Sequence, residues 1–391
     1  MKVKLSDAFD LQMGKTPPRN DRECWGDGHK WISISDIGNV GKYIDTTKEE
    51  ITDIGVSKSG IKVVPKGTVI MSFKLSIGKT AITAEDMYTN EAIMAFINKE
   101  KYEIDTDYLY HMCKGIDWFE GTNKAVLGLT LNKATMSEKI IEIPPMEVQL
   151  HVVSVLDKMD ELISLRKEQL AKLDQLVKSR FIELFGDPYI NDKNWIVDPL
   201  GNYMTTLTDF SANGSYELLD SNVIMYDEPN YAVMVRTTDL ESGDLSSGVK
   251  YIDKSAYELL NKSKLFGGEL IMNKIGSAGK IYIMPYINRP ASLGRNAFMF
   301  RFDDRLNMKY LYFLLSSDYG TNEIQQYVRG AVTKTITKDS TRAIKIIVPP
   351  IELQNQFAAF VEQTDKSKLA IQASLDKLEL LKKSLMQEYF G

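Results

Sequence analysis

The chain has 391 residues, of which 43% are hydrophobic and 26% charged, and its formal net charge is −5 at pH 7. These values are ordinary for a globular protein of two or three domains, and the acidic net charge does not by itself suggest a nucleic-acid binder. No apolar run reaches the ~18–20 residues of a membrane helix, and MKVKLSDAFD at the N-terminus has no apolar signal segment, so we expect a cytoplasmic protein. Cys24 and Cys113 lie far apart without metal-ligand or redox spacing, which predicts reduced structural thiols.

Residues 1–143 are expected to form an α+β globule rich in loops. Short runs of β-branched and aromatic residues, bounded by Gly, Asn and Asp, predict strands, and DYLYHMCKGIDWF predicts a helix at Asp107–Phe119. The predicted strands are Lys30–Ile37, Ile61–Val64, Thr68–Phe73, Lys79–Thr83, Ala92–Ile97 and Lys139–Ile143.

Residues Met146–Phe185 are expected to form one long helix. Apolar residues recur at every seventh position, which predicts a helix that pairs with another helix. They are Leu156, Ile163, Leu170, Val177 and Leu184, with Met159 and Leu173 on the companion line. Pro144-Pro145 is a start signal and Gly186-Asp187-Pro188 a stop signal. At 1.5 Å per residue the rod is roughly 60 Å long, so we interpret it as a spacer.

The second half of the chain repeats the first. Residues Ile351–Phe390 match the first rod at an offset of 205 without insertion, and Pro349-Pro350 precedes them. The globules share scattered anchors at offsets of 201 to 205 and have otherwise diverged. The anchors include Ser35-Asp36-Ile37 with Thr238-Asp239-Leu240, Met71-Ser72-Phe73-Lys74 with Met272-Asn273-Lys274, Gly78-Lys79 with Gly279-Lys280, and Tyr108-Leu109-Tyr110 with Tyr310-Leu311-Tyr312.

The repeat predicts the domain organisation. We expect a globule at 1–143, a helical spacer at 144–186, a second globule at 187–348 and a C-terminal helical spacer at 349–391. The fold class is α+β: two α/β globules separated by two long helices, which pair as an intramolecular antiparallel coiled coil with pseudo-two-fold symmetry. Because the rods are alike and the globules differ, the globules are expected to touch different targets and the rods a shared one.

Motifs for catalysis are missing. His29, His111 and His151 are isolated from one another and from the cysteines. Gly78-Lys79-Thr80 resembles the end of a phosphate-binding loop, but Phe73 stands where that loop needs a glycine. Ile143-Pro144-Pro145 lacks the polar first residue of the Asn/Asp-Pro-Pro motif of amino-methyltransferases. We therefore predict a chain without catalytic or metal-binding residues.

Recognition is the remaining function class. Lys and Arg neutralise phosphates, whereas Asn and Arg also read base edges. The candidate DNA-binding residues are Lys74, Lys79, Lys124 and Lys133 in the first globule and Lys274, Lys280, Arg295, Asn296, Lys334 and Lys338 in the second. Neither globule is net basic, since residues 1–143 hold 19 basic and 21 acidic residues and residues 186–348 hold 18 and 19. The pairs Lys74/Lys274, Lys79/Lys280 and Lys133/Lys338 are interpreted as repeat-equivalent, which favours phosphate contacts for them.

The whole chain resembles the specificity subunit of type I restriction-modification enzymes. The resemblance rests on the duplicated globule–rod plan, on IPPMEVQ and VPPIELQ at the rod entries, and on LDQLVKSRFIELFGDP closing the first rod. It implies two target-recognition domains, each reading one half of an asymmetric bipartite DNA target, with rods that set the gap and dock the methyltransferases. It also implies two methyltransferase subunits and two motor-nuclease subunits as partners. S-adenosylmethionine, ATP and Mg would be bound by those partners, which carry the adenine-N6 methyltransferase and ATP-dependent endonuclease activities.

Some alternatives stay open at this point. A structural adaptor with two protein- or glycan-binding globules on a coiled coil has the same plan, and a stand-alone nuclease or methyltransferase is a third hypothesis that the missing motifs disfavour. Four cations, Arg166, Arg180, Lys368 and Lys382, interrupt the apolar seam of the rods. They either extend past the seam into solvent or face the partner subunits.

Overall fold

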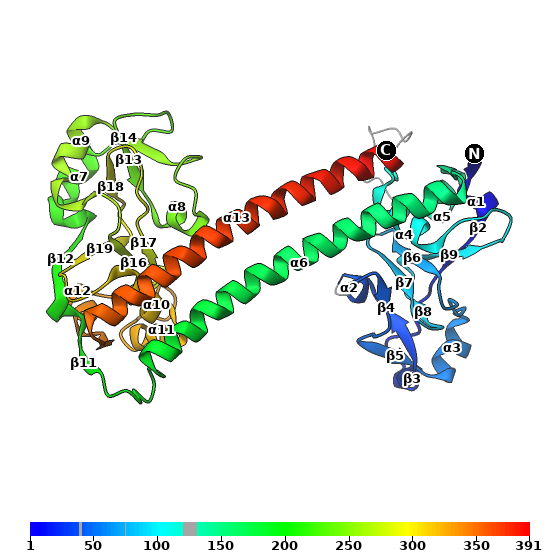
Figure 1. Ribbon diagram of the computed structural model, residues 1–391, viewed down its shortest axis with the longest axis horizontal. Helices are drawn as coiled ribbons and strands as arrows, with labels where there is room; N and C mark the ends of the chain where they lie inside the picture. Colours follow the sequence, from blue (N-terminus) through cyan, green and yellow to red (C-terminus); the bar gives the residue numbers. More distant parts are fainter. Residues whose placement is uncertain (39–40, 75, 120–130) are drawn as a thin grey trace. The chain divides into compact units, whose positions relative to one another are not determined.

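The structure, a computed structural model, describes residues 1–38, 41–74, 76–119 and 131–391. It divides the chain into two compact units, Met1–Gln169 with Ile371–Gly391, and Leu170–Ala370. Each unit combines one globule with segments of two long helices, α6 (Met146–Phe185) and α13 (Ile351–Phe390) (Figure 1). Both helices cover the predicted residues, and the predicted tandem duplication is confirmed.

The first globule consists of short strands and short helices. Its strands are β1 (Lys2–Lys4), β2 (Phe9–Met13), β3 (Trp25–Ile32), β4 (Tyr43–Ile44), β5 (Glu49–Ile51), β6 (Val69–Ser72), β7 (Thr80–Thr83), β8 (Tyr88–Thr89), β9 (Ile93–Asn98) and β10 (Ile140–Glu142). Its helices are α1 (Leu5–Ala8), α2 (Ile34–Ile37), α3 (Asp53–Ser59), α4 (Thr106–Gly115) and α5 (Lys133–Glu138), with a 3-10 turn at Arg22–Cys24.

These strands form two main sheets that share an apolar layer. One has the order β2-β9-β6-β7-β4 and the other β5-β3-β8, in which β3 and β8 are parallel. On β6, Ile70 belongs to a cluster that includes Ile32 of the other sheet, whereas Val69 and Met71 belong to a cluster with Leu156 of α6. This division follows from the two-residue period of a strand, which sends alternate side chains to opposite faces. The sheet is therefore covered by the smaller sheet on one face and by helices on the other.

Most predicted elements of the first globule are present, with three corrections. The predicted strand Lys30–Ile37 ends at Ile32, because the Asp36 carboxylate accepts a hydrogen bond from the backbone N–H of Ser33 (2.8 Å) and caps helix α2. Ile61–Val64 is not a strand, and its Val64 makes only an isolated bridge to Met87. Helix α4 ends at Gly115 rather than at residue 119, since the indole of Trp118 folds back and donates to the carbonyl of Cys113 (2.9 Å).

The second globule has the same kinds of element. Its strands are β11 (Ile196–Pro199), β12 (Met204–Asp209), β13 (Ala232–Val235), β14 (Lys250–Ile252), β15 (Lys264–Leu265), β16 (Leu270–Asn273), β17 (Ile281–Ile283), β18 (Ala291–Leu293), β19 (Ala297–Phe302) and β20 (Lys345–Val348). Its helices are α7 (Tyr216–Asn222), α8 (Thr237–Ser242), α9 (Lys254–Leu259), α10 (Met308–Ser316), α11 (Asp318–Gln325) and α12 (Lys338–Ala343), with 3-10 turns at Leu200–Tyr203, Phe210–Asn213 and Asn261–Ser263.

The sheet topology of the second globule repeats that of the first. One sheet has the order β12-β19-β16-β17 and matches β2-β9-β6-β7, and the other has the order β14-β13-β18-β15 and matches β5-β3-β8 with one added strand. The parallel pair β13·β18 corresponds to β3·β8. Asp239 repeats the cap of Asp36, because its carboxylate accepts from the backbone N–H of Arg236 (2.8 Å) at the start of α8. The duplication thus extends to individual hydrogen bonds.

One buried glutamine fastens the start of α6 to the first globule. Gln149 accepts a hydrogen bond from the backbone N–H of Asp105 and donates two, to the carbonyls of Glu103 and Pro144, each at 2.9 Å. The side chain has no exposed surface. Its amide is satisfied at both ends, so a single residue joins the helix start, the Pro-Pro segment and the loop before α4.

Gln354 makes the same set of bonds at the start of α13. It accepts from the backbone N–H of Asn307 (2.8 Å) and donates to the carbonyls of Arg305 (3.2 Å) and Pro349 (2.8 Å). Gln354 is also fully buried. The Pro-Pro-x-Glu-x-Gln motif therefore occurs twice because each helix needs this fastening residue.

The predicted heptad seam is visible in the burial of both helices. Every seam position is buried or half-buried, whereas most positions between them are exposed. These positions are Leu156, Met159, Ile163, Arg166, Leu170, Leu173, Val177, Arg180 and Leu184 on α6 and Val361, Thr364, Lys368, Ile371, Leu375, Leu378, Lys382 and Leu385 on α13. Within the first unit Lys382 pairs with Asp160 and Lys167 with Glu379 (2.9 Å), and within the second Lys368 pairs with Asp174 (2.5 Å). The order of these partners makes the pairing antiparallel, as predicted.

The four seam cations all have partners in this chain. The two lysines reach past the seam to aspartates of α6. Arg180 pairs with Glu183 (2.8 Å) and lies over the ring of Phe360, and Arg166 donates to Gln169 (2.7 Å). These contacts agree with cations that extend past the seam, and the interpretation that they face partner subunits stays a prediction.

The charges beside the seam also specify its register. Asp160, Lys167 and Asp174 follow one another at steps of seven and alternate in sign. A slip by one heptad would place Lys382 opposite Lys167 in one direction and Glu379 opposite Asp160 in the other. Like charges in contact repel, so both slips replace attraction by repulsion.

A charge exchange tests the seam. We expect Lys382→Asp to destabilise the first unit by about 1 kcal/mol or less, because the pair with Asp160 is partly exposed and the change brings two carboxylates together. Combining it with Asp160→Lys restores an attractive pair and most of the stability. Urea unfolding of both variants measures this coupling, and a double variant no more stable than Lys382→Asp alone would contradict it.

Candidate nucleic-acid interface

Two of the predicted cations of the second globule meet at one edge of its β12-β19-β16-β17 sheet. Lys274 follows β16 and donates to Asp209 (2.7 Å), the last residue of β12, and Lys338 at the start of α12 donates to the same carboxylate (2.8 Å). Both ammonium groups lie within about 6 Å of the ring centre of Phe298. Burial would raise the pKa of the Asp209 carboxyl, but the two lysines outweigh it and hold that pKa below its usual value.

This ion cluster divides the predicted contacts into two kinds. The Lys274 side chain is only 13% exposed, so it serves chiefly to neutralise Asp209 inside the fold. Lys338 is 33% exposed and keeps part of its ammonium surface in solvent. Asp209 was not a candidate in the sequence, because its link to Lys338 spans 129 residues and no local pattern marks it.

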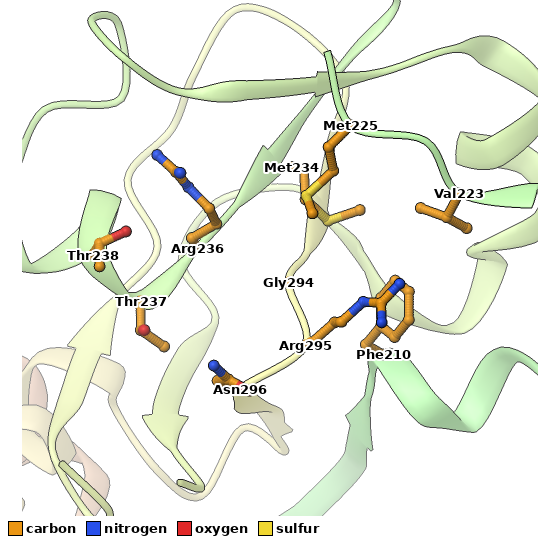
Figure 2. A pocket seen from close by; sticks show the side chains of 10 residues that line it. All are labelled: Phe210, Val223, Met225, Met234, Arg236, Thr237, Thr238, Gly294, Arg295 and Asn296. Carbon is orange, nitrogen blue, oxygen red and sulfur yellow. The ribbon is translucent and has the colours of Figure 1, made fainter. Parts of the chain in front are cut away.

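Arg295 and Asn296 lie next to this cluster, on the loop between β18 and β19. They border a hollow of about 310 Å³. Figure 2 shows Arg295 beside the ring of Phe210, whose centroid lies 5.1 Å from the guanidinium carbon. Phe210, Val223, Met225 and Met234 supply the apolar wall, and Arg236, Thr237, Thr238, Arg295 and Asn296 supply polar groups.

The polar groups at the hollow differ in how far they are engaged. Arg236 is occupied, since it donates to Asp239 and to the carbonyl of Gly248 (2.8 Å). Arg295 pairs with Asp220 (3.1 Å) in an exposed contact. The side chain of Asn296 is exposed, and none of the residues that the structure describes hydrogen-bonds to its amide group. The hollow therefore offers one free amide and one loosely held guanidinium.

The other two candidates of the second globule border a separate hollow of about 430 Å³. Lys280 pairs with Glu241 of α8. Lys334 uses its backbone carbonyl to accept from the N–H of Gly276 (2.9 Å). The structure therefore brings Lys274, Lys338, Arg295 and Asn296 close together and places Lys280 and Lys334 beside the β16–β17 hairpin.

The candidates of the first globule are more scattered. The ammonium of Lys79 lies against Gly38, at the end of α2. The ammonium of Lys74 lies 5.3 Å from the ring centre of Phe73, and Lys133 begins α5. Lys124 lies outside the described residues.

The hydrogen bonds of the two hairpins correct one of the predicted repeat pairs. Lys79 and Lys280 are equivalent, because their carbonyls accept from the N–H groups of Ser72 (2.9 Å) and Asn273 (2.8 Å) at the same place in the hairpin. The same frame aligns Phe73 with Lys274, so the pair Lys74/Lys274 is wrong. The error arose because MSFK and MNK both end in lysine, although the first has one more residue.

Lys133 and Lys338 do occupy equivalent positions. Each is the first residue of a short helix whose preceding residue caps it. The cap is Asn132, which accepts from the N–H of Thr135 (3.0 Å), or Thr337, which accepts from that of Ser340 (3.1 Å). Of the three predicted pairs, two are thus equivalent in the fold.

Glu91 is a residue that the sequence did not single out. Its carboxylate accepts a hydrogen bond from the Thr16 hydroxyl. Burial would raise the pKa of Glu91, but hydrogen bonds from the Thr16 hydroxyl and from its own backbone N–H, together with the charges of Lys74 and Arg19, hold that pKa below its usual value. Close by, Arg19 stacks over Trp25, with its guanidinium carbon 3.9 Å from the ring centre. A charged, exposed carboxylate thus lies among cations in the first globule.

A buried titratable cluster joins the first globule to α6. His111 has no exposed surface and shares a hydrogen bond with Asp157 (2.7 Å), which also accepts from Lys42 (2.8 Å). Desolvation lowers the pKa of His111, and the Asp157 carboxylate offsets this only in part. The hydrogen bonds from Lys42 and His111 lower the pKa of Asp157 despite its burial.

This cluster predicts that the first unit loses stability in mild acid. As the pH falls below about 6.5, the unfolded state takes up a proton at His111 that the folded state resists, so the free energy of unfolding decreases. Phe313 is the equivalent residue of the second globule. We therefore expect His111→Phe to reduce the pH dependence of the free energy of unfolding between about pH 5 and 7. Hydrogen exchange in α4 measures it, and the exposed His151→Gln serves as control. A His111→Phe profile as steep as that of the parent would contradict the assignment.

Other chemistry is not apparent in the described ranges. No three His, Cys, Asp or Glu side chains there are grouped to hold a metal ion. Cys24 and Cys113 are buried free thiols. Among the helices that the structure describes, none is long and apolar enough to cross a membrane.

The sequence matches one protein family over most of its length. A profile described as the type I restriction modification DNA specificity domain covers residues 1–175 and 201–380. The MjaIX specificity subunit of a type I restriction enzyme from Methanocaldococcus jannaschii is 24% identical over 386 residues, covering 92% of this chain and 85% of that relative. The MjaVIII specificity subunit from the same organism is 22% identical over 396 residues and covers 98% and 90%.

Solved structures share the fold. A chain from a study of complex assembly and conformational transition of the type I R-M system aligns with a TM-score of 0.65 at 17% identity, covering 100% of this chain and 97% of that one. The S subunit from M. genitalium aligns with a TM-score of 0.53 at 14% identity, covering 100% and 96%. Because the profile covers both halves, the chain belongs to the type I restriction-modification DNA specificity family, as a specificity subunit that is not itself an enzyme.

Proposed function

We propose that each globule reads one half of an asymmetric bipartite DNA target and that α6 and α13 set the gap between the halves. The observation that carries this proposal is the contrast between the repeats. The fold, the caps and the fastening glutamines occur twice, whereas the polar residues at the candidate interface differ between the globules. Two copies of one frame with different reading residues fit two different half-sites.

The shared parts of the repeat fit shared partners. The proposal includes two methyltransferase subunits, docked on the helices through the pseudo-two-fold, and two motor-nuclease subunits in the restriction form. S-adenosylmethionine, ATP and Mg would be bound by these partners, and the whole assembly would work in the cytoplasm. The target adenine must leave the base stack for methylation, so this chain holds the duplex while a partner flips the base.

The charge balance also favours a role for the partners. Neither globule is net basic, and many of the candidate cations are paired with carboxylates in this chain. Phosphate neutralisation dominates nucleic-acid affinity. We therefore expect weak DNA binding by this chain alone and tight binding with a co-expressed methyltransferase. The adaptor hypothesis predicts no binding to duplex DNA in either case and is not favoured by the family.

Sequencing of methylated adenines tests the proposal. In a host that carries this chain with its methyltransferase, the expected result is one target with two unlike halves and a fixed gap. A methyltransferase-inactive strain supplies the background. A single contiguous target, or two identical half-sites, would contradict the proposal.

A further inference from the structure

Two loops occupy the same place in the two repeats. In the first globule, the loop of residues 90–92 is held by the N–H of Asn90, which donates to the carbonyl of Ile32 (3.0 Å), and by the carbonyl of Ala92, which accepts from Phe73 (3.0 Å). Each loop leads from the parallel strand, β8 or β18, into the central strand, β9 or β19. They are called the first and second reading loops below.

The second reading loop, residues 294–296, is held by the same two bonds. The N–H of Gly294 donates to the carbonyl of Val235 (2.8 Å), and the carbonyl of Asn296 accepts from the N–H of Lys274 (2.9 Å). The frame therefore aligns Glu91 with Arg295 and Ala92 with Asn296. The backbone is common to both repeats, and the side chains are not.

The side chains differ in the property that matters for reading a base. Glu91 is an anion that only accepts hydrogen bonds, Arg295 is a cation that only donates, and Asn296 does both. At two nearby positions the chemistry is unchanged, since Lys79 matches Lys280 and Lys133 matches Lys338. Contacts to the phosphate backbone are needed by both repeats, whereas base contacts must differ if the half-sites differ.

Both loops present these groups to solvent. Glu91 and Asn296 are exposed, and Arg295 is 39% exposed on its side chain. The Thr16 hydroxyl donates to Oε2, one of the two carboxylate oxygens of Glu91. In the second globule no residue within the described ranges bonds to the Asn296 side-chain amide, and the hollow beside it has an apolar wall that includes the exposed Met225 (Figure 2). A wall of this kind fits the methyl group of a thymine.

We infer that the reading loops are the base-reading elements, with Glu91 specifying a base in the first half-site and Arg295 and Asn296 specifying bases in the second. In the major groove, Glu91 accepts a hydrogen bond from the N4 amino group of cytosine. Asn296 donates to N7 of adenine and accepts from its N6 amino group. Arg295 donates to O6 and N7 of guanine. The inference rests on the proposed function, because it assigns residues to the two half-sites.

Two isosteric exchanges test the inference. Glu91→Gln turns an acceptor into a donor and acceptor, and Asn296→Asp makes the reverse change, so neither alters the shape of its loop. For each variant, we expect a preference change of roughly 10- to 100-fold at one base, in the first half-site for Glu91→Gln and in the second for Asn296→Asp. Sequencing of the methylated sites, together with binding to duplexes varied at each base, measures the change.

Lys280→Ala is the matched control. It removes a cation from the hairpin of the same globule and is expected to weaken binding to all duplexes with the base preferences and the gap unchanged. Co-purification with the methyltransferase shows that each variant is folded. Suppose that the unmodified chain directs methylation of a bipartite target and that the folded variants keep its base preferences. This result would overturn the inference and leave the proposed function intact. If the unmodified chain does not direct methylation of a bipartite target, the proposed function itself is overturned.

Discussion

Replacing Phe185 with alanine is expected to destabilise the second unit by about 3–5 kcal/mol. Phe185 is the last residue of α6 and has no exposed surface. Its ring lies 4.6 Å from that of Tyr310, 4.9 Å from Phe181 and 5.6 Å from Phe357, measured between centroids. Truncation loses the favourable free energy of burying the ring. It also leaves a cavity among aromatic rings that cannot move to fill it, and the cavity adds its own cost. Chemical denaturation or hydrogen exchange in α10 measures the loss.

The repeat supplies a control for Phe185. Phe390 ends α13 at the equivalent position but is only half-buried, and its ring contacts that of Tyr108 at 5.5 Å. Phe390→Ala is therefore expected to cost the first unit less, about 1–2 kcal/mol. Equal losses for the two variants would show that the difference in burial between the two helix ends has no energetic consequence.

Gln354→Ala is expected to destabilise the second unit by about 3 kcal/mol, because it leaves the partly buried N–H of Asn307 without its acceptor and two carbonyls without their donor. Gln354→Glu keeps the shape but should cost at least as much, since a carboxylate cannot donate to carbonyls and is buried as a charge. Gln149→Ala should have a similar effect on the first unit, where the same three bonds are present. Urea unfolding measures all three variants.

Gln356 is the control for these changes. It lies two residues from Gln354 on the same helix and is exposed. Its replacement by alanine should change the free energy of unfolding by less than about 0.5 kcal/mol. A loss at Gln354 no larger than that at Gln356 would contradict the fastening role.

The long helices and the duplication could be predicted because their signals are local and periodic. The heptad positions from Leu156 to Leu184 follow from spacing alone, and the buried Gln149 and Gln354 stand in a motif that occurs twice. The fold class followed from these two features. The strand at Lys30–Ile37 was predicted too long, because the cap made by Asp36 overrides the strand propensity of the isoleucines.

The candidate site could be predicted only in part. A search for Lys, Arg and Asn on predicted loops singled out Lys338, Arg295 and Asn296, but it treated Lys274 as a DNA contact like the others. Lys274 is neutralised by Asp209, a residue 65 positions away in the sequence. Glu91 was missed because the search was for basic and amide side chains, and its relation to Arg295 becomes visible only when hydrogen bonds align the repeats. Charge alone cannot separate a surface cation from one that is paired inside the fold.

Exchange of one globule tests the central claim most directly. Residues 1–143 are replaced by the corresponding globule of another family member with a different target, and methylated adenines are sequenced in the same host with the same methyltransferase. The account predicts that one half of the target changes, while the other half and the gap stay as they were. A chimera that methylates the parent target unchanged, or one in which both halves change together, would contradict the claim that each globule reads its own half.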